Sequence, residues 1–276
     1  MAIGDISLSS SARANLTALT STTNLLSQTQ EHLSTGKTVN SASDNATAFF
    51  ASQGFLNTAN DLNNVKDNLS SALESVNSFD NSIADVTSVV VQLQGLTTQA
   101  LGTTNTATRA GLASQFNALN TQLDELVNDA TFNGSNLLNS TGSTLVVFFN
   151  ETNTTALTIT GVNVTSAGLL TSSGNTAANS WANATDIQTS QSFLLTALST
   201  LRTDAANFGG NATLIQTRQD FTTNLITSLQ NASSDLVQAD TNTEGANLQA
   251  LQAQDQLGIV SLGISGTLEQ AILRIL

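Results

Sequence analysis

The fold is decided by residues 62–101, which read LNNVKDNLSSALESVNSFDNSIADVTSVVVQLQGLTTQAL. Apolar side chains recur there every three or four residues, at Leu62, Val65, Leu69, Leu73, Val76, Phe79, Ile83, Val86, Val90 and Leu93. This spacing places them on one face of an α-helix. Such a helix would be about 60 Å long, and its roughly forty residues far exceed the usual ~11 of a globular domain. We therefore expect rod-like helix packing.

Other helices are expected on both sides of this one. Residues 112–130 also have helical spacing and should run back along the first helix, because only a short segment after Gly102 separates the two. Helical spacing returns over residues 187–236, with an expected break at 208–211. The chain is thus predicted to be mainly α, leaving on helices and returning on helices, so that its two ends lie side by side.

A small β-hairpin is predicted between the outgoing and returning helices, at about residues 144–165. Residues 145–149 form a continuous apolar run, and residues 157–164 alternate apolar with polar side chains, with a change of phase at Gly161. The turn-rich segment 150–155 joins the two strands, and Gly161 is expected to form a bulge or bend.

Residues 166–185 are rich in Ser, Thr, Asn and Gly and are expected to form a variable polar tip. They contain the single tryptophan, Trp181. Its side chain is either an exposed anchor for a partner or packs the tip onto the helices, and we favour the packing role.

Both ends of the chain carry apolar stripes at helical spacing with few charges. We expect their side chains to form an assembly interface, composed of Leu16, Leu19, Leu26, Leu33, Leu257, Val260, Ile264, Leu268, Ile272 and Ile275. Chain termini are usually polar and frayed, so stripes of this kind are expected to be buried against other molecules. We expect these molecules to be other copies of the same chain.

The charge balance argues against several classes of partner. Seven Lys and Arg against twenty Asp and Glu give a net charge of −13, which disfavours nucleic acid and anionic membranes. No apolar stretch approaches the ~20 residues that span a bilayer, and no cleavable secretory signal is visible. Proline is absent, which favours long uninterrupted helices or, alternatively, rapid refolding without slow isomerisation.

No constellation of catalytic or metal-binding residues is apparent. The chain has no cysteine and one histidine, His32, which we interpret as a solvated or interface residue. The acidic residues are spread along predicted helix faces rather than converging on one point. We expect no enzyme activity, no metal and no cofactor.

Three motifs follow one another along the chain. The N-terminal motif is HLSTGKTVNSASDNATAFFAS, residues 32–52, and TFNGSNLL follows at residues 131–138. The C-terminal motif is LVQADTNTEGANLQALQAQDQLGIVSLGISGTLEQAILRIL, residues 236–276. In this order, the three motifs resemble those of bacterial flagellins of the short type.

The resemblance implies a subunit that self-assembles into the extracellular flagellar filament for motility. Residues 1–40 and 236–276 would form the terminal coiled-coil inner domain and residues 41–235 a helical outer-core domain, with no separate large outer domain beyond it. Family members leave the cell unfolded through the flagellar type III channel. The expected partners are other copies of the chain, the export apparatus, a flagellin chaperone, and the filament cap and hook-junction proteins.

One part of the long helix departs from the pattern of many flagellins. Those proteins carry two arginines and a glutamate where this chain has Gln92, Gln94 and Gly95, before Leu-Thr-Thr-Gln at residues 96–99. The loss of these charges predicts weak or no recognition by the animal innate flagellin receptor.

Two alternative functions compete with that of a filament subunit. A flagellin-like hook–filament junction protein would share the same termini but occur in few copies. A coiled-coil adhesin or surface-layer protein would also be acidic and free of cysteine, but would be expected to carry a signal peptide or an anchor.

Overall fold

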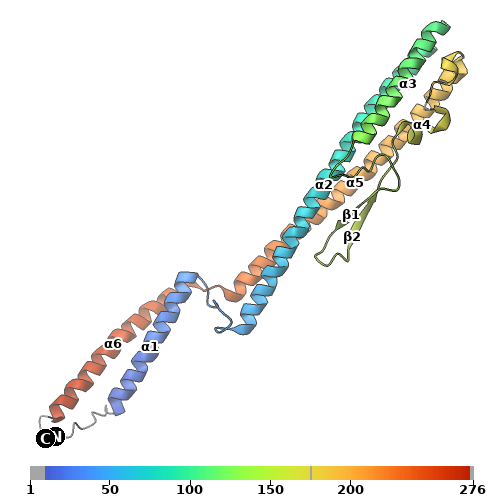
Figure 1. Ribbon diagram of the computed structural model, residues 1–276. Coiled ribbons are helices and arrows are strands. Elements are labelled where there is room, and N and C mark those ends of the chain that lie inside the picture. Colours follow the sequence, from blue (N-terminus) through green and yellow to red (C-terminus); the bar gives the residue numbers. More distant parts are fainter. Residues whose placement is uncertain (1–9, 175, 274–276) are drawn as a thin grey trace. The chain divides into compact units, whose positions relative to one another are not determined.

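The computed structural model describes residues 10–174 and 176–273 and is mainly α-helical (Figure 1). Its elements are α1 (Ser10–Thr35), α2 (Ala46–Leu101), α3 (Thr106–Asp129), β1 (Thr144–Phe148), β2 (Ala156–Thr160), α4 (Ser166–Gly174), the 3-10 helix η1 (Ala178–Trp181), α5 (Ala184–Val237) and α6 (Thr241–Leu273). The predicted fold class is confirmed: the chain consists of long helices and one small two-stranded antiparallel sheet.

The chain divides into two compact units. The terminal unit joins the residues up to Thr58 with those from Ser228 onward, and the outer unit comprises Ala59–Thr227. The helices α2 and α5 each contribute to both units. These units divide near residues 58 and 228, and the expected inner and outer-core domains divide near residues 40 and 236.

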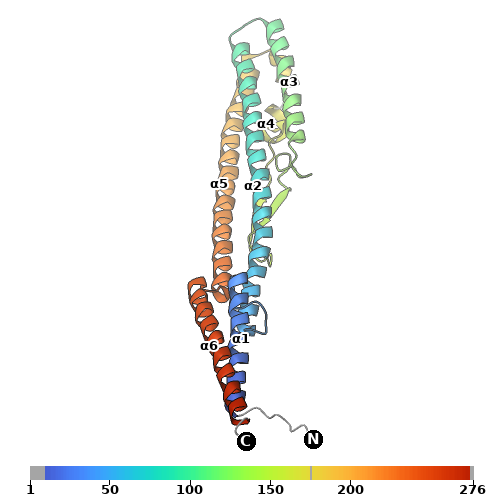
Figure 2. The same ribbon diagram turned by 90° about the vertical axis from the view of Figure 1, so that its left-hand side faces the viewer.

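The outer unit is built on the predicted apolar face of α2. Nine of the ten residues in that stripe are buried and Leu73 is partly buried, in a core shared with α3 and α5. Figure 2 shows α2, α3 and α5 side by side. The helix begins at Ala46 rather than near Leu62, because the Asn45 side chain accepts a hydrogen bond from the Ala48 amide and caps an earlier first turn.

The predicted break at residues 208–211 is wrong, since α5 runs through both glycines. A glycine in a helix costs about 1 kcal/mol relative to alanine, which local packing can offset. Phe208 is 2% exposed and its ring centroid lies 6.4 Å from that of Phe79 on α2. Burial of this aromatic side chain keeps the segment helical.

The hairpin forms as predicted, with Leu145 paired to Ile159 and Val147 to Leu157. The Asn150 side chain closes the connecting loop by accepting hydrogen bonds from the Thr154 and Thr155 amides.

The second strand ends at Thr160, earlier than predicted. The Val162 and Val164 amides instead donate to the carbonyls of Leu137 and Leu138. Gly161 makes this bend possible, because a Cβ atom there would lie 2.5 Å from the Ser140 carbonyl oxygen.

The expected polar tip at residues 166–185 is largely helical and packs against α3 within the outer unit. Both Asp124 oxygens accept hydrogen bonds from Ser166, one from its amide and one from its hydroxyl, and so cap α4. Leu170 and Trp181 are fully buried, which confirms the packing role of the tryptophan. Polar composition concealed this because a few large apolar side chains anchor the segment.

Candidate assembly surface

The helices α1 and α6 pack side by side in the terminal unit and run antiparallel (Figure 1). Asn15 donates a hydrogen bond to the Ser261 hydroxyl at 3.1 Å, near one end of the pair. Farther along, a Cβ atom on Gly258 would lie 3.0 Å from Leu19 Cδ1, so the glycine lets the two helices approach closely. This is the predicted juxtaposition of the two ends of the chain.

A His–Glu pair links the other end of α1 and α6. His32 Nδ1 lies 3.0 Å from Glu244 Oε1, and both side chains are largely buried, at 13% and 14% exposure. His32 stands in the last turn of α1 and Glu244 in the first turn of α6, where the helix dipoles favour a cation and an anion respectively. His32 is therefore largely buried in the contact between α1 and α6 and is not a solvated residue.

The segments leading out of α1 and into α6 pair through backbone hydrogen bonds. The Thr38 amide donates to the Val237 carbonyl at 2.8 Å, and the Ala239 amide donates to the Gly36 carbonyl at 2.9 Å. Gly36 has a φ of +69°, a conformation that favours glycine, immediately after the helix ends. The pairing fixes the point from which α1 and α6 extend.

Two exposed carboxylates order the loops at this junction. Asp44 accepts hydrogen bonds from the amides of Ser41 and Asn40, and these hold its pKa below the usual value. Asp240 accepts from the Thr243 and Asn242 amides, with the same effect on its pKa. Both side chains are ionised near neutral pH and stabilise the loop before α2 and the start of α6.

The predicted interface residues of α1 divide between two environments. Leu19, Leu26 and Leu33, each seven residues from the next, are half-buried, whereas Leu16 is 44% exposed. The three half-buried leucines share the face on which Leu19 meets Gly258. Part of the predicted α1 stripe is therefore occupied within the chain itself.

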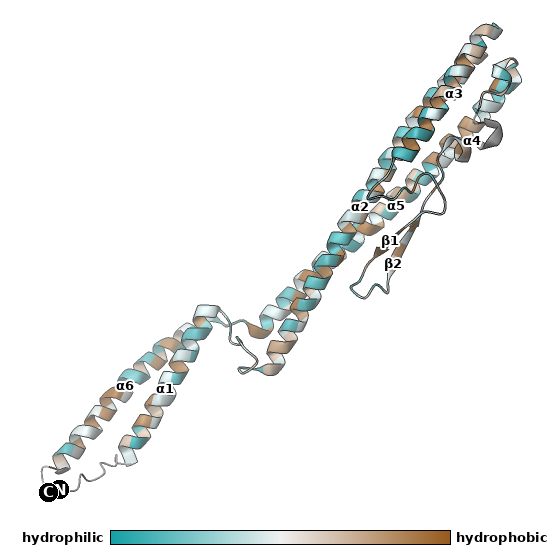
Figure 3. Ribbon diagram, viewed as in Figure 1, coloured by the Kyte–Doolittle hydropathy of each residue, from teal (hydrophilic) through white to brown (hydrophobic). Residues whose placement is uncertain are grey.

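The predicted residues of α6 are turned away from α1. Four of them, which we name the outer stripe, are highly exposed: Leu257 at 69%, Val260 at 59%, Ile264 at 56% and Leu268 at 58%. The half-buried side of the helix instead carries Leu251, Gly258 and Leu262. Figure 3 shows apolar segments along α6. Ile275 and the side chain of Ile272 lie outside the described part of the chain.

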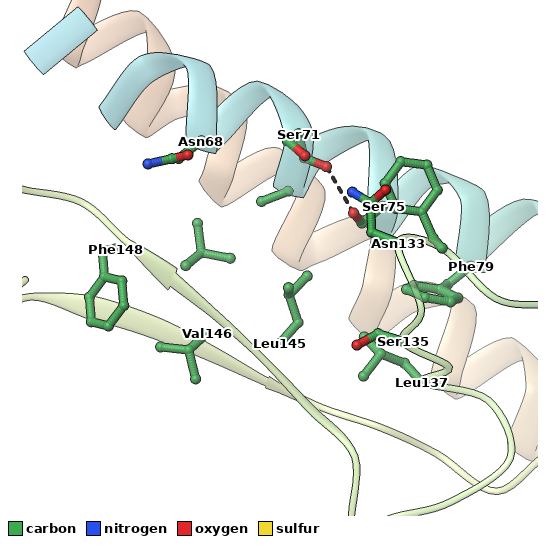
Figure 4. Close-up of a pocket in the computed structure, with 13 residues that line it drawn as sticks. Asn68, Ser71, Ser75, Phe79, Asn133, Ser135, Leu137, Leu145, Val146 and Phe148 are labelled. Atoms are coloured by element: carbon green, nitrogen blue, oxygen red, sulfur yellow. Dashed lines mark hydrogen bonds between the residues drawn. The ribbon is translucent and has the colours of Figure 1, made fainter. Parts of the chain in front are cut away.

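A pocket in the outer unit offers no catalytic chemistry. It has a volume of about 360 Å³ and lies between α2 and the hairpin, with Phe79, Leu137 and Leu145 on its walls (Figure 4). Its polar lining consists of Asn and Ser side chains, with no acidic or basic group among the described residues. Within the described ranges, no acidic, histidine or cysteine side chains cluster as metal ligands. No described helix is long and apolar enough for a membrane span.

Comparison with known proteins identifies the family. The family model for the bacterial flagellin N-terminal helical region matches residues 6–143. The flagellin FljM of Caulobacter vibrioides is 31% identical over 99% of this chain and 98% of its own length. The chain belongs to the bacterial flagellin family. A flagellin of Brucella melitensis is 30% identical, over 98% of both chains.

A solved structure supports the fold independently. The crystal structure of Bacillus cereus flagellin matches with a TM-score of 0.50 at 18% identity, covering 56% of this chain and 88% of the other. Taken together, the comparisons make this flagellin a structural subunit of the extracellular flagellar filament. The predicted localisation and structural role are thus confirmed.

Sequence reasoning missed the division of α6 into two faces. The face toward α1 contains Gly258 and two serines that bond Asn15 beside Leu251 and Leu262, so its apolar pattern is interrupted by small and polar residues. The small residue at position 258 was the available signal, because close helix approach requires one.

Proposed function

We propose that the chain polymerises by burying the outer stripe of α6 against neighbouring copies in the filament. The observation that supports this is the exposure of four large aliphatic side chains on the face turned away from α1. Their 3- and 4-residue spacing forms one continuous strip, and no charged residue lies between Asp255 and Glu269. Burial of each such side chain contributes roughly 1.5–3 kcal/mol.

The remaining apolar positions extend the proposed contact. Leu16 and Leu25 on α1 are 44% and 48% exposed, while Leu19, Leu26 and Leu33 are half-buried on the face of α1 where Leu19 meets Gly258 of α6. We therefore assign Leu16 to contacts between copies and the three half-buried leucines to holding α6 in place. Ile272 and Ile275 continue the outer stripe in sequence and belong to the same proposal.

Export of the chain unfolded through the flagellar type III channel accords with family membership and composition. The chain has no cysteine that could form a disulfide before transit. It also has no proline, so refolding outside the cell is free of slow X-Pro isomerisation. A flagellin chaperone, the filament cap and hook-junction proteins are the further partners that we propose.

Seeded assembly tests the proposed function. Purified chain added to short filament fragments is expected to elongate them into filaments visible by electron microscopy, because each added copy buries its outer stripe. A hook–filament junction protein would bind at fragment ends without elongating them. Addition that stops at the ends would therefore favour this alternative over a filament subunit.

The purified monomer is expected to be a poor agonist of the animal innate flagellin receptor. Between Val86 and Leu101, α2 carries no charged residue, and Gln92 and Gly95 are exposed where many flagellins present charges. A receptor surface that pairs with charges would find only neutral amides there. A receptor-reporter cell assay over a range of monomer concentrations measures this, and potent activation at low concentration would contradict it.

A further inference from the structure

The outer unit contains a groove between α2 and α3 whose rim consists of glutamines. Its volume is about 530 Å³, and we name it the glutamine groove. Its lining comprises Gln92, Gly95, Leu96 and Gln99 from α2 with Gln115, Ala118, Leu119 and Gln122 from α3. The glutamines on each helix are seven residues apart and exposed, whereas Leu96 and Leu119 are half-buried and form an apolar floor.

The groove lies in a part of the chain that presents almost no charge. Residues 86–123 contain one charged side chain, Arg109, which is only 9% exposed. Its Nε donates to the carbonyls of Ala100 and Thr103, at 3.1 and 2.8 Å. Each copy carries a net charge of −13, so two copies repel each other. This repulsion is weakest where the surfaces that meet carry no carboxylates.

A second apolar feature of the outer unit has a matching character. On α5, Leu214, Phe221 and Leu225 are 41%, 58% and 36% exposed, and their spacing of seven and four places them on one face. We name these three residues the α5 ridge. Residues 205–234 hold only two charges, Arg218 and Asp220, of opposite sign.

The cation beside the ridge is already engaged within the chain. The Arg218 guanidinium carbon lies 4.9 Å from the centroid of the Phe149 ring, a cation–π contact. The ridge therefore presents three apolar side chains with no net charge around them, which suits the neutral rim and apolar floor of the glutamine groove.

We propose that the glutamine groove of one copy receives the α5 ridge of the next copy in the filament. This deepens the proposed function and rests on it. Gln219 bonds Ser70 at 2.6 Å, so the ridge is level with that part of α2. The groove is centred some 25 residues farther along α2, roughly 40 Å at 1.5 Å per residue. Two different patches displaced along the subunit make a head-to-tail contact, which repeats without closing into a ring.

Charge placed on the groove rim should weaken polymerisation. Gln92 and Gln122 are exposed, and the double substitution Gln92→Glu with Gln122→Glu keeps the size of both side chains. The variant should therefore fold normally, which far-UV circular dichroism can verify. At low ionic strength the critical concentration is expected to rise about tenfold, with much of the effect removed by salt. Gln216→Glu, exposed on α5 and turned away from the ridge, is the control and should polymerise like wild type. Wild-type behaviour of the double variant would overturn the proposal.

Cross-linking tests the identity of the two surfaces, because the chain has no cysteine of its own. Ala118→Cys places a thiol in the groove and Thr217→Cys one beside the ridge, at exposed positions. Mild oxidation of filaments of the double variant is expected to give a ladder of disulfide-linked oligomers, absent for either single variant and for monomer. Filaments that form but yield no ladder would overturn this contact. Failure of the wild type to elongate seeds would instead remove the proposed function itself.

Discussion

Replacing Ile264 with Asp is expected to abolish seeded elongation. The side chain is 56% exposed in the centre of the outer stripe, so the isolated chain tolerates a carboxylate there without loss of its own packing. In the filament the same carboxylate would be buried without a partner, at a cost of several kcal/mol. About 3 kcal/mol already corresponds to a roughly hundredfold rise in critical concentration. Sedimentation of polymer against monomer, with electron microscopy of the pellet, measures the effect.

Ile259 provides a matched control on the same helix. It is also isoleucine and 55% exposed, but lies on a different side of α6 from the outer stripe. Ile259→Asp introduces the same charge and is expected to change the critical concentration much less. If both variants block elongation equally, or if Ile264→Asp elongates seeds normally, the outer stripe is not the face that copies bury.

The fold was predictable wherever one helix face is strongly apolar. The spacing from Leu62 to Leu93 predicted α2 because nearly every one of those side chains enters the core. The earlier part of α2 gave no such signal, since its contact with α5 includes polar groups. Ser52 and Ser233 are both 3% exposed and their hydroxyl oxygens lie 2.8 Å apart. In the sequence, two buried serines cannot be distinguished from exposed polar residues. Apolar periodicity alone therefore placed the start of α2 too late.

The sequence selected the apolar residues of α6 that the candidate surface contains, but not the direction in which they face. Spacing selected Leu257, Val260, Ile264 and Leu268 as one stripe, and the structure places all four on an exposed face. Spacing gave no way to decide whether that stripe faces α1 or another copy. The decision depends on Gly258 and on the serines that bond Asn15, which have no apolar signature. Close approach through small residues is a property of two helices together, so one helix pattern cannot reveal it.

Replacing Trp181 with Ala is expected to cause a large loss of stability in the outer unit. The side chain is fully buried, its ring centroid lies 5.0 Å from that of Phe116, and its Nε1 donates to the Ser190 hydroxyl at 3.2 Å. Removal of a buried aromatic side chain typically costs about 3–5 kcal/mol. For a unit of this size, that corresponds to a fall in Tm on the order of 10 °C, measured by far-UV circular dichroism.

Strain in the local backbone should make the loss of stability on replacing Trp181 larger than the buried area of its side chain alone predicts. Asn179, Ser180 and Trp181 have φ values of 48°, 50° and 54°, in the left-handed region that costs about 1–2 kcal/mol per residue. Burial of the indole must offset that strain, so Trp181→Ala should also increase amide hydrogen exchange around η1. Trp181→Phe keeps most of the apolar contact and should lose less, while Leu195→Ala, at a 54% exposed site on α5, should change little. Equal Tm values for Trp181→Ala and Leu195→Ala would contradict a role for the indole in holding the segment against the helices.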